Sequence, residues 1–394
     1  MTDLTSLHDL AARPGMAALL AALGPGTSRL VGGAVRDSLL GLAVQDLDLA
    51  TSLSPYEVMR RCGAAGIKTV PTGIAHGTVT AVSSGQVVEV TTLRSDVSTD
   101  GRWAEVAFTD DWRADAERRD FTINALFFDP ASGELFDFFG GLEDLSAGRV
   151  RFIGDPLRRI AEDHLRILRF FRFHARFGRG PFDPDGLAAC LARANDLMAL
   201  SRERIADELL KLLALPKPAE TLRVMVEGAV LRAVIPEIEA AALSSLERVV
   251  EAEAAAGINP DGLRRLAALL PPDPPTAERV AARLKLSNKA RKRLALSADR
   301  DLDGSPRALA YWIGLEGAVD RLLLAGRDAA AAEIAGWTVP RLPVGGGELI
   351  KRGLAPGPAV AATLKAIERR WVAEDFPGHE RLEQLIAEGM TTAA

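Results

Sequence analysis

The hydrophobic pattern of the chain changes near residue 155, and this change limits the folds that the sequence can adopt. Before it, short runs of β-forming residues are separated by glycine, aspartate and serine, as in RLVGGAV, DLDLAT, GTVTAVS and QVVEVTTL. Such runs predict about six or seven strands in an α/β or α+β domain. After it, apolar residues recur every three or four positions almost without interruption, which is typical of helices. The sequence therefore predicts an α+β N-terminal part followed by an all-helical remainder.

The composition excludes several classes of protein. With 394 residues, of which 48% are apolar and 26% charged, the chain is expected to form more than one globular domain. Its two cysteines exclude a disulfide framework and a cysteine-rich zinc site. Because it has neither an apolar run of ~20 residues nor a basic N-terminal leader, we expect a cytoplasmic protein without a membrane segment. The net charge of −5 means that RNA binding would require local basic patches.

A glycine pair lies between a strand-like run and a helix-like run in LVGGAVRD, residues 30–37. Gly32 and Gly33 would let backbone N–H groups approach a phosphate, and Arg36 would add a guanidinium fork for phosphate oxygens. Taken alone, such a pair is more often a tight turn without a ligand.

Two carboxylates follow this turn in QDLDLAT. If residues 46–50 form a strand, Asp46 and Asp48 point to the same face while Leu47 faces the core. Adjacent carboxylates repel each other unless a cation lies between them, and Mg²⁺ takes such oxygen ligands while leaving sites for phosphates. The alternative is a solvated strand edge. Glu89, in the alternating run VVEVTT, is a candidate third metal ligand, although single acids in such runs usually face solvent.

Two arginines precede the apolar run in RRDFTINALFFD. Arg118 and Arg119 could contact the phosphates or ribose of a nucleotide, or they could belong to a salt-bridged rim.

Residues 155–177 predict one long helix. On it Asp163 and Arg166 are three apart and therefore neighbours, which could present a donor and an acceptor to the edge of a base. An ordinary salt bridge would produce the same spacing. Arg169 continues the same stripe. Arg172 is nine residues from Asp163, half a turn away on an ideal helix.

Together and in this order, GGAVRD, DLDLAT, RRDFTINA and EDHLRILRFFRF resemble the class II CCA-adding enzymes over residues 30–213. These tRNA nucleotidyltransferases share a polymerase-β-like head with bacterial poly(A) polymerases. The resemblance implies roles for individual residues. Asp46 and Asp48 would be the catalytic metal-binding pair, and Asp163 and Arg166 would read the base of CTP or ATP. The other nucleotide-binding positions it implies are Gly32, Gly33, Arg36, Arg118, Arg119, Arg169 and Arg172.

The resemblance also implies a division of the chain. We expect a catalytic head at 1–145, a helical neck at 146–215 and an all-helical, tRNA-binding body and tail at 216–394. FDFFGGLEDL, residues 136–145, is similar to the hinge motif between head and neck. The expected cofactor is Mg²⁺. The expected partners are CTP, ATP and the 3′ end and acceptor arm of tRNA, with no membrane and no obligate protein partner.

Three features discriminate among members of this superfamily, in which a poly(A) polymerase is the main alternative. PTGIAHGTVTAV, residues 71–82, resembles a strand common in CCA-adding enzymes rather than the corresponding poly(A) polymerase segment. Residues 92–117 are long enough for the flexible loop associated with A addition, which argues against an enzyme that adds only the two Cs. His379 is the only histidine after His174, which excludes an appended phosphohydrolase domain. A non-catalytic RNA- or nucleotide-binding protein is a further alternative, but it predicts loss of the metal ligands, which are present.

A basic run in the C-terminal half, RLKLSNKARKRL at 283–294, is a candidate contact for tRNA phosphates. The alternative is a solvated helix face. The residues concerned are Lys285, Lys289, Arg291, Lys292 and Arg293.

Overall fold

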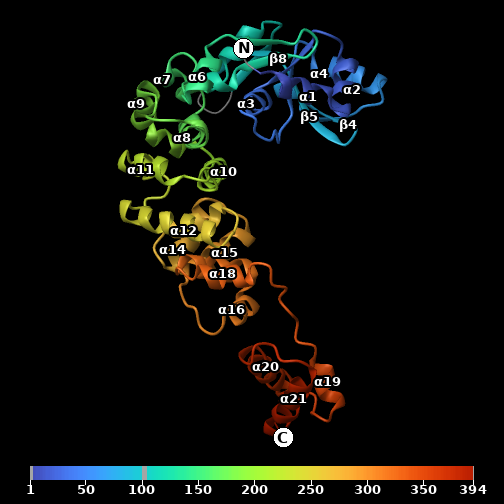
Figure 1. Cartoon of the computed structure of the whole chain (residues 1–394), viewed down its shortest axis with the longest axis vertical. Helices are drawn as coiled ribbons and strands as arrows, with labels where there is room; N and C mark the ends of the chain where they lie inside the picture. Colours follow the sequence, from blue (N-terminus) through green and yellow to red (C-terminus); the bar gives the residue numbers. More distant parts are fainter. Residues whose placement is uncertain (1–2, 100–103, 394) are drawn as a thin grey trace. The chain divides into compact units, whose positions relative to one another are not determined.

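The computed structural model describes residues 3–99 and 104–393, and the chain forms two compact units (Figure 1). Unit 1 comprises Met1–Ser201 with Gly228–Val234, and unit 2 comprises Arg202–Glu227 with Ile235–Ala394. Unit 1 holds the strands, whereas unit 2 is helical throughout its described residues. The predicted α+β class is confirmed. The boundaries expected near residues 145 and 215 stay predictions.

Unit 1 is built on a mixed seven-stranded sheet. With the two strands of a separate hairpin, its described residues form nine strands, more than the six or seven predicted. The strand order is β3-β4-β5-β2-β1-β8-β9. β2 and β5 are parallel, and the other neighbours are antiparallel. The strands are β1 (Ser28–Val31), β2 (Asp48–Thr51), β3 (Lys68–Gly73), β4 (Thr78–Ser83), β5 (Gln86–Thr92), β8 (Leu126–Asp129) and β9 (Glu134–Asp137). A separate hairpin consists of β6 (Arg94–Thr99) and β7 (Ala104–Phe108).

Helices cover the sheet because its strands bury alternate side chains. In β4, Val79 and Ala81 are fully buried. A Cβ at Gly15 would lie 2.3 Å from the carbonyl oxygen of Ser83, so α2 approaches β4 in a way that only glycine permits at this point. The helices within residues 1–120 are α1 (Thr5–Ala12), α2 (Pro14–Leu23), α3 (Gly33–Leu39), α4 (Pro55–Ala64) and α5 (Trp112–Glu117).

The single helix predicted over residues 155–177 is wrong. The structure has α7 (Pro156–Glu162) and α8 (Arg166–Phe177), separated by a break at Asp163. The Asp163 carboxylate accepts from the backbone N of Leu165 at 3.1 Å, a local bond that competes with helical pairing. The guanidinium of Arg166 donates to the carbonyl oxygen of Arg159 at 2.9 Å, which satisfies a C-terminal carbonyl of α7.

Aromatic side chains attach α8 to the rest of unit 1. The ring of Phe121 lies 4.9 Å from that of Phe152 and 5.3 Å from that of Phe173, centroid to centroid. Phe152 in turn stacks on Phe170 at 5.3 Å. Such pairs add to the burial of their apolar area. Two further helices of this unit are α6 (Gly141–Ala147) and α9 (Pro184–Ala192).

Unit 2 confirms the all-helical prediction. Several of its helices begin after an aspartate or serine whose side chain accepts from the first turn, as Asp261, Asp273, Ser287 and Ser305 do. Its helices are α10 (Arg202–Leu213), α11 (Ala219–Glu227), α12 (Leu243–Ala255), α13 (Gly262–Leu269), α14 (Pro274–Arg283), α15 (Asn288–Ala298), α16 (Pro306–Ile313), α17 (Leu315–Leu324), α18 (Asp328–Ile334), α19 (Gly346–Lys351), α20 (Pro358–Ala373) and α21 (His379–Ala393).

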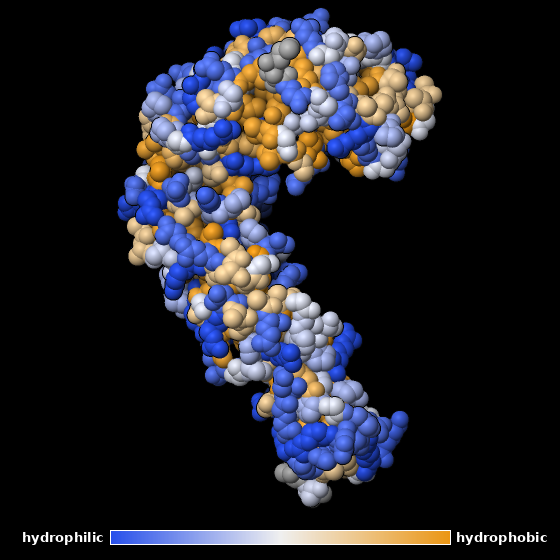
Figure 2. All heavy atoms as spheres, viewed as in Figure 1, coloured by the Kyte–Doolittle hydropathy of each residue, from blue (hydrophilic) through white to orange (hydrophobic). Residues whose placement is uncertain are grey.

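The surface of the C-terminal helices is mainly hydrophilic in the view of Figure 2. Ion pairs link these helices, as between Arg352 of the α19–α20 connection and Glu383 of α21 at 2.5 Å. Across the described residues, no helix is long and apolar enough to span a membrane.

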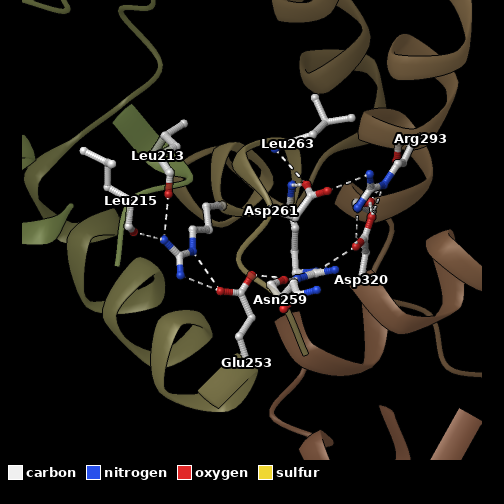
Figure 3. A network of polar contacts seen from close by, with 11 residues as sticks. Leu213, Leu215, Glu253, Asn259, Asp261, Leu263, Arg293 and Asp320 are labelled. Carbon is white, nitrogen blue, oxygen red and sulfur yellow. Dashed lines mark hydrogen bonds and ion pairs between the residues drawn. The ribbon is translucent and has the colours of Figure 1, made fainter. Parts of the chain in front are cut away.

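A buried ionic network holds the first part of unit 2 together (Figure 3). Glu253 of α12 accepts from Arg264 at 2.6 Å and from Arg265 at 2.8 Å. Arg265 also donates to the carbonyl oxygen of Leu213 at 2.7 Å, which ties α13 to the end of α10. Asp320 of α17 accepts from Arg264 at 2.8 Å.

Arg293 also belongs to this network. Its sequence context had made it a candidate contact for tRNA phosphates. Its Nε donates to Asp320 at 2.7 Å and its Nη1 donates to Asp261 at 2.9 Å, and its side chain is 16% exposed. A guanidinium that is paired in this way inside the unit is not presented to RNA phosphates.

We predict that Asp320→Asn destabilises the protein by about 3–5 kcal/mol, because it removes the fully buried carboxylate that Arg264 and Arg293 share. Urea unfolding followed by circular dichroism measures this loss. Glu316→Gln on the same helix is the control, since the exposed pair of Glu316 with Lys289 (3.4 Å) contributes at most about 1 kcal/mol. Equal effects of the two substitutions would contradict a central role for Asp320.

Candidate active site

The glycine turn joins β1 to α3 at one end of the sheet. Gly32 has φ +64° and ψ −123°, a conformation that favours glycine. A Cβ at this position would lie 3.5 Å from Nη1 of Arg119 and 3.7 Å from the carbonyl oxygen of Asn124. The turn therefore lies directly against the segment that carries the predicted arginine pair.

The two aspartates of DLD lie where the chain enters the centre of the sheet. The strand begins at Asp48 rather than at residue 46, so Asp46 precedes it and is exposed, while Leu47 is buried as expected. β2 runs parallel to β5 with Asp48 opposite Glu89. The structure thus places the candidate third carboxylate, which is exposed, on the strand next to Asp48.

The carboxylates form a locally acidic environment. Burial, Glu89 and Asp46 together raise the pKa of Asp48 to about 6, although Arg119 acts in the opposite direction. A bound cation would relieve this repulsion, so the donor set fits a divalent metal. Among the described side chains, no group of three or more acidic, histidine or cysteine residues could hold a metal on its own.

A buried carboxylate that the sequence analysis did not single out, Asp115, holds both predicted arginines. Its Oδ1 accepts from Nε of Arg118 at 2.8 Å, and its Oδ2 accepts from Nη2 of Arg119 at 2.9 Å. Burial and the nearby Arg119 and Arg94 lower the pKa of Arg118 to about 10, against the opposing effect of Asp115. The sequence signal for this role was the spacing, because Asp115 lies three and four positions before the two arginines and such residues are neighbours on a helix.

A second buried carboxylate, Asp120, connects this segment to α8. It accepts from Nε of Arg169 at 2.7 Å and from the amide of Asn124 at 2.9 Å. Burial alone would raise its pKa, but Arg169, the Asn124 amide and Arg166 lower the pKa of Asp120 to about 2.

The proposed base-reading pair lies at the break between α7 and α8. Arg166 forms its ion pair with Glu162 at 2.7 Å, not with Asp163, and it also donates to the carbonyl oxygen of Arg118 at 2.9 Å. The expected position of Arg172, half a turn from Asp163, assumed one unbroken helix, whereas the structure has two helices there. Arg169 and Arg172 are three apart on α8, and the Arg172 guanidinium lies 4.6 Å from the ring centroid of Phe173.

Arg36 lies in the interior, although the resemblance implied a phosphate contact. Its side chain is 5% exposed and donates to Asp37 at 2.8 Å and to Asn124. Its guanidinium also lies 4.3 Å from the ring centroid of Phe177, and burial lowers its pKa. Because Phe177 ends α8, Arg36 connects the helix after the glycine turn to α8.

The remaining predicted positions lie elsewhere. In unit 2, Arg291 pairs with Glu278 at 2.5 Å and Lys285 pairs with Glu203 at 3.1 Å, all with considerable exposure. Lys292 is exposed and forms no ion pair with the described side chains. Residues 92–117, predicted to hold a flexible loop, contain the β6–β7 hairpin. Positions 100–103 of this segment lie outside the described residues.

Comparisons with known proteins agree with this geometry. Residues 28–151 match the poly A polymerase head domain family, and residues 181–242 match a family described as the probable RNA and SrmB-binding site of polymerase A. The Bacillus stearothermophilus CCA-adding enzyme in complex with CTP superposes with a TM-score of 0.72. It is 29% identical, and the match covers 93% of this chain and 94% of that one. The fold and the carboxylate site therefore define a nucleotidyltransferase with a polymerase-β-like head.

Relatives that match most of the chain identify the family within this class. The human mitochondrial CCA tRNA nucleotidyltransferase 1 is 35% identical over 374 residues, which cover 87% of this chain and 82% of that protein. The Lacticaseibacillus paracasei CCA-adding enzyme is 32% identical, with 88% of each chain covered. The chain belongs to the family of CCA-adding enzymes.

We predict that Arg36→Lys lowers the stability by about 2 kcal/mol, since lysine cannot replace the fork between Asp37 and Asn124. In the folded variant the KM for CTP should stay within about threefold of the wild-type value, because the side chain faces the interior. Urea unfolding and steady-state kinetics measure the two effects. A large rise in KM without loss of stability would instead indicate a phosphate contact.

Proposed function

We propose that this protein adds C, C and A to the 3′ end of tRNA without a nucleic-acid template, using CTP and ATP and releasing pyrophosphate. The observation that carries the proposal is the meeting of Asp46 and Asp48 with Arg119 and the Gly32 turn at one end of the sheet. The relatives named as CCA-adding enzymes over nearly the whole chain support the choice of substrate.

In the proposed reaction, the RNA 3′-hydroxyl attacks the α-phosphorus of the nucleotide. The bond to the β-phosphate oxygen breaks, the hydroxyl proton passes to solvent, and pyrophosphate leaves. Asp46 and Asp48 would hold Mg²⁺, which when bound lowers the pKa of the attacking hydroxyl and neutralises charge on the leaving oxygens. Arg119 and the backbone at Gly32 and Gly33 would position the triphosphate. The exposed Glu89 is close enough to Asp48 to serve as a further ligand.

Selection of the nucleotide is assigned to Asp163 and Arg166. Glu162 and the carbonyl oxygens of Arg159 and Arg118 fix the Arg166 guanidinium, which prepares it to bond to a base edge. Arg169 and Arg172 continue on α8 as additional nucleotide contacts.

Two further assignments accompany this function. We assign tRNA backbone contacts in unit 2 to Lys285, Lys289 and Lys292, with Arg291 as a weaker candidate because of its pair with Glu278. A cytoplasmic location is proposed from the sequence, whereas the human and mouse relatives are named as mitochondrial.

The nucleotides added to tRNA test the proposed reaction. On tRNA transcripts that lack CCA, the protein with CTP, ATP and Mg²⁺ should add two C and one A and then stop, as read by gel electrophoresis and sequencing. Transcripts that lack only the final A should accept one A. Open-ended ATP addition to an oligo(A) primer without use of CTP would identify a poly(A) polymerase instead, and no turnover would identify a binding protein.

Replacement of Asp48 tests the proposed metal-binding role of the carboxylates. Asp48→Asn should lower the rate of incorporation by on the order of 10³-fold or more, because several kcal/mol of charge stabilisation depend on this ligand. Chelation of divalent ions should abolish the wild-type activity, and Mg²⁺ should restore it. Glu117→Gln, an exposed acid near the same site, is the matched control and should remain active. An active Asp48→Asn variant would contradict the assignment.

A further inference from the structure

The buried side chain of Asp115 has no role in the function described so far. It is 1% exposed on the short helix α5, and each of its two oxygens accepts from a different arginine. The arginines lower its pKa even though burial acts in the opposite direction. A buried aspartate remains charged under these conditions because its partners compensate for the lost hydration.

Three arginines, Arg94, Arg118 and Arg119, lie near Asp115. Arg94 and Arg119 both act electrostatically on Arg118, and the nearest carboxylate to this group is Asp115. Among the described residues, Nε of Arg119 is buried and lacks a hydrogen-bond acceptor. One carboxylate therefore orients two guanidinium groups without neutralising them, which leaves their charge for an anionic ligand.

The same carboxylate also contacts the start of the β6–β7 hairpin. The backbone N of Arg94, the first residue of β6, donates to Oδ1 of Asp115 at 3.3 Å. Arg119, on the other oxygen, is near the Gly32 turn and Asp48. Asp115 thus bonds to two parts of the chain, the start of β6 and the Arg118–Arg119 pair, and Arg119 lies at the candidate triphosphate site.

We propose that Asp115 is a positioning residue for the nucleotide triphosphate. It touches neither the substrate nor the metal. It fixes the rotamers of Arg118 and Arg119 so that their outer N–H groups face the phosphates. Its bond to the backbone of Arg94 also holds these side chains at a fixed position relative to the start of the hairpin. The proposal rests on the proposed function, since it assigns the anion as the triphosphate of CTP or ATP.

Steady-state kinetics of Asp115→Asn test the proposal. The amide keeps the size of the carboxylate but loses the charge and one acceptor. We expect the KM for CTP and ATP to rise by about tenfold or more, because small displacements of binding groups are costly. The kcat at saturating nucleotide and the KM for tRNA should change by less than about threefold. Asp115→Glu should recover part of the nucleotide KM, and Glu117→Gln on the same helix should match the wild type.

Equilibrium binding of radiolabelled CTP separates positioning from a general loss of structure. If Asp115 acts through Arg119, the affinity lost in the Asp115→Asn, Arg119→Ala double variant should be clearly smaller than the product of the two single losses. A multiplicative loss, an unchanged nucleotide KM, or a parallel fall of kcat with a rise in the KM for tRNA would overturn the proposal. Wild-type protein that fails to extend tRNA would refute the proposed function instead, independently of these variants.

Discussion

The ion pair between Asp120 and Arg169 joins the sheet to the helix that carries the proposed nucleotide contacts. It does not act alone: Arg166 and Arg159, from α8 and α7, donate to the carbonyl oxygens of Arg118 and Glu117. Three guanidinium groups from the two helices thus bind one four-residue segment. Buried charge pairs add little net stability compared with apolar packing, but they tolerate little displacement. Their use here fixes α7 and α8 against the segment that carries Arg118 and Arg119.

A site for a triphosphate has to collect positive charge before its ligand arrives, and that charge must be stable in the free protein. In this structure, buried aspartates hold the arginine side chains in place. Asp115 and Asp120 orient arginines that face the proposed site, whereas Asp37 holds Arg36, which faces the interior. The acids near the metal position behave differently. Asp48 has acidic neighbours that raise its pKa, so a cation is favoured there.

Much of this was predictable from the sequence where a periodic pattern or a short motif carried the signal. The switch from strands to helices, the Gly32 turn and the placement of Glu89 beside Asp48 followed from such patterns. The failures have different physical causes. At Asp163 local bonds interrupt the helix, because the Asp163 carboxylate accepts from the backbone N of Leu165 and Arg166 donates to a carbonyl of α7, and the apolar period does not reveal such bonds. Arg36 and Arg293 look like surface cations in the sequence, but Asn124 and Asp320, 88 and 27 positions away, bury them. Asp115 escaped attention because one acid near two arginines resembles an ordinary surface pair.

The difference between buried and exposed ion pairs also determines which cations of unit 2 are available to RNA. The pairs of Arg293 lie inside the unit, so a phosphate would have to displace both Asp320 and Asp261, and the buried Asp320 would lose one of its two guanidinium partners. The pair between Lys289 and Glu316 has side chains 82% and 59% exposed, and such pairs contribute at most about 1 kcal/mol. A phosphate can replace Glu316 there at little expense. Lys289 is therefore a better candidate for an RNA backbone contact than Arg293, because a phosphate can bind it without disturbing a buried carboxylate.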